Sequence, residues 1–571
     1  CAHGRDLAMQ GGSGAGGFAG LRVLTRLEFR PAYNRRCGLA RFTEAMQMGL
    51  PRVLKWLLIG IVVVGAALFA LRAYRALSGP PLHPWHTFVP AEMRQSELDA
   101  ADWPRYLARE GQIFESVRAE VSQKLDRDER VPINRYFEDS PVYPAHFAQD
   151  WNRSYVMEPD GRPIGAVVLL HGLTDSPYSL RHIAKLYRDR GFVAIGVRIP
   201  GHGTVPGGLS NVRWEDWMAA TRLAVREARR RVPAPGPLHL VGFSNGGALA
   251  MKYELDAIED PKLLRADRLV LLTPMIGITR FARFAGLAAL PAVLPPFANA
   301  AWLSVVPEFN PFKYNSFPVN GARQSYRLTD ALQSQIQRLA RADQLGSLPP
   351  VLTFQSVIDF TVSTPAILTA LYSLLPDNGS EIVLFDVNRT VKFGPLLRPV
   401  AYVALDRLTP TTPQPYRFTS IMNATDNSDA TIERSIAPGQ LLAVDRALNL
   451  PYPPGIFSLS HLAIPIPMDD PLYGLQPDPT LRPEFGFSLG TMGARGERGA
   501  LVVDQDFLTR LSSNPFFPYL LERVEEGITR PSGPTGRDLA ASQAPGIPVR
   551  LESLLSTFLT DDTQPQPFAG P

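Results

Sequence analysis

Residues 237–253 read Pro-Leu-His-Leu-Val-Gly-Phe-Ser-Asn-Gly-Gly-Ala-Leu-Ala-Met-Lys-Tyr, and they predict a short strand, a sharp turn and a helix in succession. The turn, Gly242-Phe-Ser-Asn-Gly246, fits the pattern G-x-S-x-G. A turn of this kind strains the backbone of its serine, so the flanking positions must lack bulk. The hydroxyl of Ser244 is therefore expected to lie at the carboxyl end of a sheet, above a helix N-terminus that favours developing negative charge. A chance match to a loose pattern is the alternative, and the strand and helix on either side argue against it.

Two more buried strands are predicted before this turn. Residues 165–170 form the first and run into His171-Gly-Leu-Thr-Asp-Ser-Pro177. Residues 192–197 form the second, with Pro200-Gly-His-Gly203 and Trp214-Glu-Asp-Trp217 after it. In the order H-G, P-G-H-G, W-x-x-W and G-F-S-N-G, these pieces resemble the α/β-hydrolases of the monoacylglycerol lipase, lysophospholipase and serine aminopeptidase-like group. The resemblance is strong over 163–274 and rests on isolated points elsewhere.

The resemblance implies an α/β-hydrolase fold, which is a mostly parallel sheet with helices on both faces. It also implies an oxyanion hole that takes one backbone N–H from the loop after the first strand and one from the residue after the nucleophile. Leu173 and Asn245 are the expected donors. His171 precedes the nucleophile and stands directly at a strand end, which favours a structural role. His202 is a loop residue in the family pattern, and no catalytic role is expected for it.

A serine nucleophile needs an imidazole base, and His461 is the single histidine after the turn. The order of serine, acid and histidine then predicts the acid between Ser244 and His461. Asp359 follows the predicted strand 350–356 and is the expected acid, although a loop aspartate that caps the helix near Pro365 is the alternative. Asp386, which follows residues 381–385, is the rival acid, and Asp359 is favoured because the histidine should follow the last strand.

The same order divides the chain. Residues 80–160 are expected to be an N-terminal extension that packs on the core, and residues 161–280, 349–390 and 456–530 are expected to be three parts of the core. Residues 281–348 are expected to insert an apolar, aromatic cap that shields the reaction from water. The interval between Asp359 and His461 exceeds the usual single helix plus strand. Residues 391–455, rich in proline and threonine, are therefore expected to loop out and return, and residues 531–571 are expected to be a flexible tail.

An uncharged stretch, residues 56–71, extends past Lys55 toward the roughly 20 residues that cross a bilayer, so a transmembrane anchor is predicted over 53–72. Basic residues flank both ends, and the arginines of residues 1–47 favour an inside N-terminus. The catalytic part would then lie on the periplasmic side of a bacterial inner membrane. A cleaved signal peptide, processed near Ser78, is the alternative. Residues 1–47 themselves are expected to be a doubtful or disordered leader, since Met48 resembles a natural start.

The composition is that of a packed globular protein, with 45% hydrophobic and 20% charged residues, whereas 54 prolines indicate long ordered loops. Both cysteines, Cys1 and Cys37, fall in the leader, so no thiolate metal site is expected in the catalytic part. The net charge of +4 gives little support for nucleic-acid binding, and no phosphate loop, dinucleotide fingerprint or zinc spacing occurs. No cofactor and no metal are expected, and the oligomeric state stays open.

The expected function is that of a membrane-anchored serine hydrolase that cleaves carboxylic esters, of lipid-like or acylglycerol type, through Ser244, His461 and Asp359 and an acyl-enzyme intermediate. Two other functions remain open. One is a serine aminopeptidase or amidase that uses the same three residues, and the other is a catalytically silent scaffold for binding partners.

Overall fold

The computed structural model describes residues 37–277, 295–390, 401, 403–480, 488–491, 510 and 512–529, with side chains from Leu54 onward. The chain divides into two compact units, Cys1–Leu68 and Phe69–Pro571. Of the predicted leader 1–47, residues 1–36 lie outside the described residues. The whole of the predicted tail 531–571 also lies outside them.

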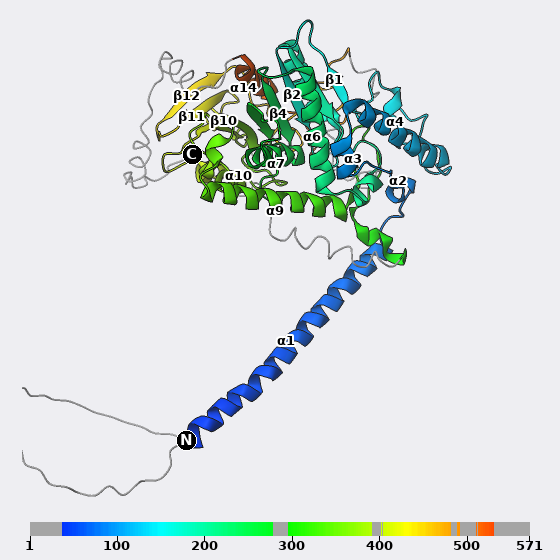
Figure 1. Cartoon of the computed structure of the whole chain (residues 1–571), viewed down its shortest axis with the longest axis vertical. Coiled ribbons are helices and arrows are strands. Elements are labelled where there is room, and N and C mark those ends of the chain that lie inside the picture. Colours follow the sequence, from blue (N-terminus) through cyan, green and yellow to red (C-terminus); the bar gives the residue numbers. More distant parts are fainter. Residues whose placement is uncertain are drawn as a thin grey trace, which may run out of the picture. The chain divides into compact units, whose positions relative to one another are not determined.

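A single large sheet organises the second unit (Figure 1). Among the described residues it holds ten strands in the order β1-β3-β2-β4-β5-β8-β9-β10-β11-β12. The strands from β3 to β10 in this order run parallel, whereas β1, β11 and β12 pair antiparallel with their neighbours. Their bounds are β1 Tyr155–Met157, β2 Gly165–Leu170, β3 Phe192–Val197, β4 Leu238–Phe243, β5 Arg268–Leu272, β8 Val351–Ser356, β9 Glu381–Phe385, β10 Arg417–Asn423, β11 Thr431–Ile436 and β12 Ala443–Leu448.

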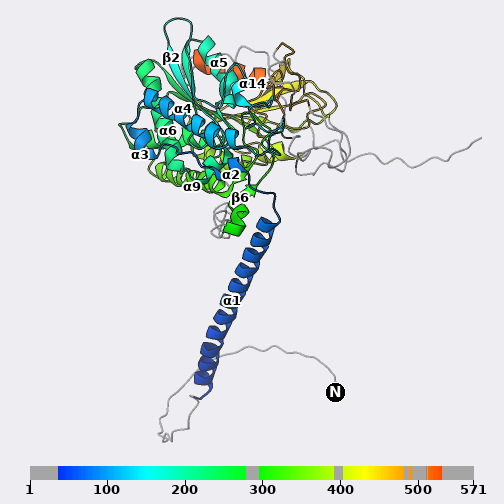
Figure 2. The same cartoon turned by 90° about the vertical axis from the view of Figure 1, so that its right-hand side faces the viewer.

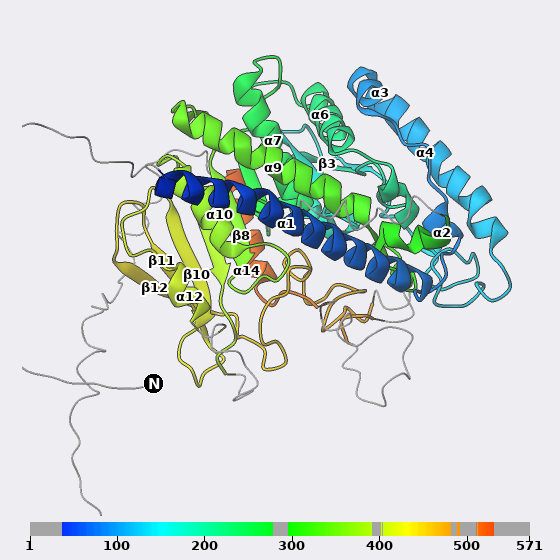
Figure 3. The ribbon, with the colours of Figure 1, turned by 90° about the horizontal axis from the view of Figure 1, so that it is seen from below.

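Helices cover both faces of this sheet, which explains why its central strands are buried throughout. In β2 the side chains of Val168 and Leu170 enter one core, and those of Val167 and Leu169 enter the other. The helices on the first face are α6 Trp214–Arg231, α7 Asn245–Glu259, α9 Val319–Arg341 and α10 Thr364–Ala370. The helices on the second face are α5 Arg181–Asp189 and α14 Phe517–Thr529. Figure 2 shows α5 and α14 on the side away from α9, and Figure 3 shows α6, α7 and α9 next to one another.

The N-terminal extension packs on the core through short helices. Its elements are α2 Pro84–Thr87, α3 Gln95–Ala100 and α4 Trp103–Glu120, and β1 at its end adds an antiparallel edge to the sheet. Trp103 and Tyr106 of α4 join the core formed with α6. A charged cluster fastens the extension to the carboxyl end of β3, where the fully buried guanidinium of Arg198 binds Glu92 at 2.8 Å and Glu110 at 3.0 Å.

The cap segment predicted over 281–348 is described only in part, because residues 281–294 lie outside the described residues. The described part begins with the 3₁₀ helix η7 Pro295–Ala301 and continues through the strands β6 Trp302–Ser304 and β7 Phe317–Pro318, which pair antiparallel, to α9. Helix α9 buries one face against α7, so this end of the segment is part of the packed domain.

Within the predicted excursion 391–455, the described residues 401 and 403–455 include strands that extend the sheet, whereas residues 391–400 and 402 lie outside the described residues. After α12 Ala404–Leu408, strand β10 pairs in parallel with β9, and the β11–β12 hairpin continues the sheet beyond it (Figure 3). Proline-rich connections suggested loops, but Arg417–Asn423 is a strand that is buried along most of its length, and Thr431–Ile436 is a partly buried strand closer to the sheet edge. Polar residues such as Thr419 and Glu433 interrupt these strands, so neither has a continuous apolar run and their sequence pattern was weak.

The first unit contains most of the helix α1 Cys37–Leu77, which includes residues 37–47 of the predicted leader. Within it, Leu54–Leu77 forms a helical stretch of 24 residues that contains an 18-residue window with a mean hydropathy of 2.4, so it is long and apolar enough to cross a membrane. The predicted anchor over 53–72 falls largely within this stretch, which runs five residues further at its C-terminal end.

The Arg198 cluster yields a stability prediction. Arg198→Met leaves two buried glutamates without their cation, and breaking a buried ion pair from one side costs about 3–5 kcal/mol. Arg222→Met is the matched control, because the pair between Arg222 and Asp99 is partly exposed and such a pair contributes about 1 kcal/mol or less. Thermal unfolding of the full chain in detergent is expected to show a much larger drop for Arg198→Met. Equal drops for both variants would contradict the role of the cluster.

Candidate active site

The turn between β4 and α7 holds Ser244 in a left-handed backbone conformation, with φ 55° and ψ −115°. Strand β5 and the residues after it keep the turn in place: the Ser244 N–H donates to the Leu272 carbonyl at 2.9 Å, and the Ser244 carbonyl accepts the Met275 N–H at 3.0 Å. A Cβ on Gly246 would lie 1.9 Å from the Leu170 carbonyl oxygen, so only glycine fits at this close approach to β2. The side chain of Ser244 therefore stands at the carboxyl end of the sheet, where the motif predicts it.

The loop after β2 lies directly against this turn. A Cβ on Gly172 would come within 3.3 Å of the Ser244 Cβ, so the backbone of the two segments is in close contact. His171 holds the loop through both ring nitrogens: Nδ1 donates to the Gly172 carbonyl at 2.9 Å, and Nε2 accepts the Ile199 N–H at 3.1 Å. Burial lowers the pKa of His171 to about 3, so the ring is neutral and this pattern of one donor and one acceptor suits it.

His171 thereby orients the peptide that carries the first predicted oxyanion donor. The carbonyl of Gly172 and the N–H of Leu173 belong to one trans peptide and point in opposite directions. Because the carbonyl is tied to the His171 ring, the N–H of Leu173 is directed away from that ring. His202 packs against His171, with ring centroids 5.0 Å apart, and burial holds its pKa well below the usual range. Both rings are buried, neutral parts of the loop packing.

The second predicted donor is the N–H of Asn245, the first residue of α7, which has no intrahelical acceptor at that position. The side chain of Asn245 is fully buried, and its Oδ1 accepts the Ser325 hydroxyl of α9 at 2.9 Å. This contact ties the start of α7 to the helix that ends the cap segment.

Asp359 and His461 meet although they lie 102 residues apart: His461 Nδ1 is 2.8 Å from Asp359 Oδ2. The side chains of His461 and Asp359 are almost fully buried, with 3% and 0% exposure respectively. The ring of His461 also contacts Phe243, which directly precedes Ser244, with centroids 5.4 Å apart. The sequence order therefore ends in a histidine that is next to the serine turn and bonded to the expected acid.

The carboxylate of Asp359 is held by several donors. Its Oδ1 accepts the N–H groups of Thr361 at 2.7 Å and Val362 at 2.9 Å, and Gln355 Nε2 lies 3.2 Å from Oδ2. Burial acts to raise the pKa of Asp359, but the charge and hydrogen bond of His461, together with the backbone donors, lower it below its usual range. The group is therefore ionised at neutral pH and can orient and stabilise an imidazolium.

The rival acid lies elsewhere. Asp386 follows β9 and bonds Arg389, with Oδ2 3.0 Å from Nε. Burial raises the pKa of Asp386 more than Arg389 lowers it. The structure thus places Asp359, and not Asp386, against His461.

The return path of the chain to His461 depends on a residue that the sequence did not single out. Asn388, in the loop after β9, donates from Nδ2 to the carbonyls of Pro453 and Ile456, both at 3.0 Å, and its N–H donates to the Phe457 carbonyl at 2.7 Å. The hydroxyl of Tyr452 reaches the Asp386 carbonyl at 3.0 Å. These bonds fasten residues 452–457 to the carboxyl end of the sheet, just before His461. The sequence also did not single out Gln355, whose side-chain amide donates to Asp359.

No group of three or more histidine, cysteine, aspartate or glutamate side chains suited to a metal ion occurs among the described residues.

Residues 161–365 match the family model described as serine aminopeptidase, S33. The match begins just before β2 and spans the serine turn, α9 and Asp359, on a sheet of the expected topology. The chain has the α/β-hydrolase fold, and residues 161–365 resemble this family. The recognition drawn from the H-G, P-G-H-G, W-x-x-W and G-F-S-N-G pieces is therefore confirmed, as is the fold class.

Known α/β-hydrolases that resemble this chain include a thermostable monoacylglycerol lipase from Bacillus sp. (strain H-257), 30% identical over 89 residues. That alignment covers 16% of this chain and 34% of the relative, so the chain spans about a third of the relative's length. A solved monoglyceride lipase from Saccharomyces cerevisiae is 14% identical over 40% of this chain and 81% of its own, with a TM-score of 0.31. The Paleococcus ferrophilus monoacylglycerol lipase is 18% identical over 41% and 87% respectively, with a TM-score of 0.30.

The pKa values of Asp359 and Asp386 are shifted in opposite directions, so the two residues predict opposite dependences of folding stability on pH. The folded pKa of Asp359 lies below its unfolded value of about 3.9, so its stabilising contribution is present above that pH and is lost as the pH falls through the folded pKa. Asp359→Asn is expected to unfold at a lower temperature than the unmodified chain at pH 7, with a deficit that shrinks on acidification below about pH 4.

The folded pKa of Asp386 is raised, so its favourable contribution is present below about pH 3.9 and is lost as the pH rises through the folded pKa. Asp386→Asn should therefore gain stability, relative to the unmodified chain, as the pH rises. Thermal unfolding of Asp359→Asn, Asp386→Asn and the unmodified chain between about pH 3 and pH 7 measures both stability differences. A deficit of Asp359→Asn that stays constant over this range would contradict the assigned direction.

Proposed function

We propose that the chain is a serine hydrolase of carboxylic esters in which Ser244 is the nucleophile, His461 the base and Asp359 the acid. The observation that carries the proposal is the 2.8 Å bond between His461 and Asp359, formed beside the strained serine turn. The family match of residues 161–365 supports hydrolysis as the reaction class.

The proposed reaction uses the hydrogen bond between His461 and Asp359. Ser244 Oγ attacks the ester carbonyl carbon while its proton passes to Nε2 of His461, the ring nitrogen that Asp359 leaves free. The ionised Asp359 stabilises the imidazolium, and the N–H groups of Leu173 and Asn245 stabilise the negative oxygen of the tetrahedral intermediate. The intermediate collapses when the bond to the alcohol oxygen breaks and His461 returns the proton to that oxygen. Water then attacks the acyl-serine by the same route and releases the acid.

We propose a lipid-like ester of acylglycerol type as the substrate. The named activity of the Bacillus relative supports this class, as does the apolar character of the sequence over 281–306, of which residues 281–294 lie outside the described residues. An anchoring helix would keep the domain close to such substrates. The amide alternative has one specific support, namely that the matching family model is described as a serine aminopeptidase. The alternative of a silent scaffold is disfavoured because the sequence keeps all three candidate residues.

We also propose that Leu54–Leu77 anchors the protein as a single pass, with the hydrolase domain on the periplasmic side of a bacterial inner membrane. The length and hydropathy of this helix support the anchor, and the arginines before it support the orientation. A reporter that is active only in the periplasm, fused after residue 80, is expected to be active. An inactive reporter in a membrane-bound fusion would overturn the orientation.

The assignment of the three residues predicts a defined pattern of labelling and turnover. A fluorophosphonate probe is expected to label the chain at Ser244, and Ser244→Ala and His461→Ala are expected to abolish both labelling and turnover. Asp359→Asn should reduce kcat by about 10²–10⁴ because the imidazole loses its orienting carboxylate. Asp386→Asn is the matched control and should keep turnover. Labelling that survives His461→Ala, or equal losses for the two aspartate variants, would refute the assignment.

The same preparations separate the reaction types. Medium-chain p-nitrophenyl esters are expected to be hydrolysed and aminoacyl anilides to be left intact, and the reverse result would establish the amidase alternative.

A further inference from the structure

We propose that a cavity of about 240 Å³ next to the C-terminal end of α1 binds the acyl chain of a membrane lipid, so that this side of the hydrolase domain docks on the bilayer. None of the three proposed catalytic residues lines the cavity. The proposal rests on the proposed membrane anchor, and it does not depend on the assignment of ester hydrolysis.

Exposed aromatic residues mark where α1 would enter and leave a bilayer. Trp56 and Tyr74 are 71% and 69% exposed. The helix between them is about 27 Å long at 1.5 Å per residue. Tryptophan and tyrosine gather at the two surfaces of a hydrocarbon layer that is about 30 Å thick. Tyr74 is therefore expected at the level of the lipid head groups, at the C-terminal end of the anchor.

Hydrogen bonds tie the described end of the cap segment to this end of α1. The guanidinium of Arg72 donates to the Trp302 carbonyl of β6 at 2.5 Å. In η7, Asn299 donates from Nδ2 to the carbonyls of Ala76 at 3.2 Å and Pro80 at 3.0 Å. Figure 2 shows β6 next to the C-terminal end of α1. These bonds hold η7, β6 and the chain around Pro80 close to the expected membrane surface.

The cavity is surrounded by an apolar patch that begins at Pro80. Six of its lining residues are apolar and either exposed or half-buried, namely Pro80, Pro81, Val131, Ile133, Val305 and Val306. They come from three separate segments of the chain, which meet around one cavity. Contiguous apolar surface is unfavourable in water, and such patches mark sites where a protein contacts another protein or a membrane. Because this patch adjoins the end of the anchor, the apolar layer of the bilayer is the partner within its reach.

Internal hydrogen bonds keep the wall of the cavity in shape. His86 accepts the His83 N–H at Nδ1 over 3.0 Å, and its Nε2 lies 3.0 Å from the hydroxyl of Ser316. That hydroxyl donates in turn to the Val306 carbonyl at 2.9 Å. Burial lowers the pKa of His86 to about 3, so its ring is a neutral part of the wall. A preformed wall spares an entering chain the cost of ordering the site.

The charged groups of the cavity favour a hydrocarbon chain over an anionic head group. Both oxygens of Glu129 have partners: Oε1 lies 2.6 Å from His83 Nδ1, and Oε2 accepts the Asp126 N–H at 2.9 Å. Glu308 is buried, and Asp128 is exposed. The lining residues that the structure describes include these three carboxylates and no lysine or arginine. A phosphate group would be repelled there, whereas a neutral chain leaves the existing bonds intact.

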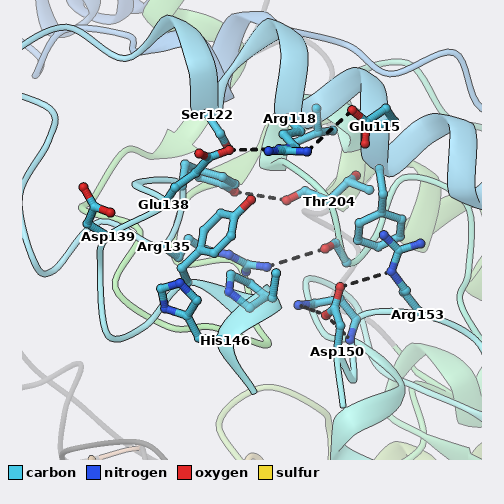
Figure 4. A pocket seen from close by; sticks show the side chains of 18 residues that line it. Glu115, Arg118, Ser122, Arg135, Glu138, Asp139, His146, Asp150, Arg153 and Thr204 are labelled. Atoms are coloured by element: carbon cyan, nitrogen blue, oxygen red, sulfur yellow. Dashed lines mark hydrogen bonds and ion pairs between the residues drawn. The ribbon is translucent and has the colours of Figure 1, made fainter. Parts of the chain in front are cut away.

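A larger cavity, of about 540 Å³ beside α4, has a different character (Figure 4). Two ion pairs line it, in which Arg118 binds Glu138 at 2.9 Å and Arg153 binds Asp150 at 3.3 Å. Covering such charges with hydrocarbon is costly, so this lining suits water. Of the two cavities, the smaller and more apolar one matches a lipid chain.

Fluorescence quenching in nanodiscs tests whether a lipid chain reaches the cavity of the full chain. Cys1 and Cys37 are replaced by serine, and Val131→Cys carries a nitrobenzoxadiazole fluorophore. The nanodiscs contain phosphatidylcholine with a doxyl quencher on its acyl chain. The matched control is Ile164→Cys, because Ile164 is also an exposed apolar residue but does not line the cavity.

The label at Val131→Cys is expected to lose most of its fluorescence, whereas the label at Ile164→Cys is expected to keep it. No quenching at either position, or equal quenching at both, would overturn the proposal. A label at Leu68→Cys, within α1, reports on the anchor separately. Quenching at residue 68 without quenching at residue 131 would refute the lipid site alone, and no quenching at residue 68 would refute the anchor on which the proposal rests.

Two further variants locate the lipid chain within the cavity. Val306→Glu adds a charge that an entering hydrocarbon chain must desolvate, so it is expected to remove most of the quenching at residue 131. Val306→Leu is the apolar control and should keep the quenching. Equal quenching in the two variants would place the lipid chain outside the cavity and overturn the proposal.

Hydrolysis of a water-soluble p-nitrophenyl ester by the same nanodisc samples is a separate readout. Because the cavity is not lined by Ser244, Asp359 or His461, failure of the lipid site and failure of the proposed ester hydrolysis remain distinguishable.

Discussion

Ser244 holds a backbone conformation that costs a residue with a side chain about 1–3 kcal/mol, and the neighbouring strands keep it there. Strand β5 binds its N–H, the residues after β5 bind its carbonyl, and β2 closes over Gly246 so tightly that no side chain fits. The strain is therefore distributed over the central strands of the sheet. A parallel sheet covered by helices on both faces is rigid enough to sustain this conformation, and it brings the carboxyl ends of its strands to one edge.

The same edge explains why distant residues converge. The loop after β2 carries Leu173, the loop after β8 carries Asp359, and the loop after β9 carries Asn388. Each loop leaves the sheet at the end where Ser244 stands. Asn388 then binds the segment 453–457 and brings His461 to this edge, although the chain has meanwhile built three further strands. The proposed triad thus depends on the register of the whole sheet more than on any one loop.

Local patterns in the sequence were sufficient for the central strands and the serine turn, because glycines, apolar runs and the H-G piece act over a few residues. The choice of His461 rested on its being the single histidine after Ser244, and the choice of Asp359 rested on the order of serine, acid and histidine that the resemblance to α/β-hydrolases implies. Strands β10 to β12 were missed because polar residues such as Thr419, Glu433 and Asp445 interrupt them, so their apolar periodicity is weak. Asn388 and Arg198 were missed because their partners lie 65 to 106 residues away, and no local spacing marks such contacts.

The long separation between the proposed acid and base also bears on synthesis. Serine, acid and histidine leave the ribosome in that order, and β10 to β12 emerge before the histidine does. A chain that stops between residues 247 and 460 has the serine turn but no imidazole after it. Such a truncated chain would therefore lack the proposed base. Hydrolysis would then begin only in molecules whose synthesis has passed residue 461.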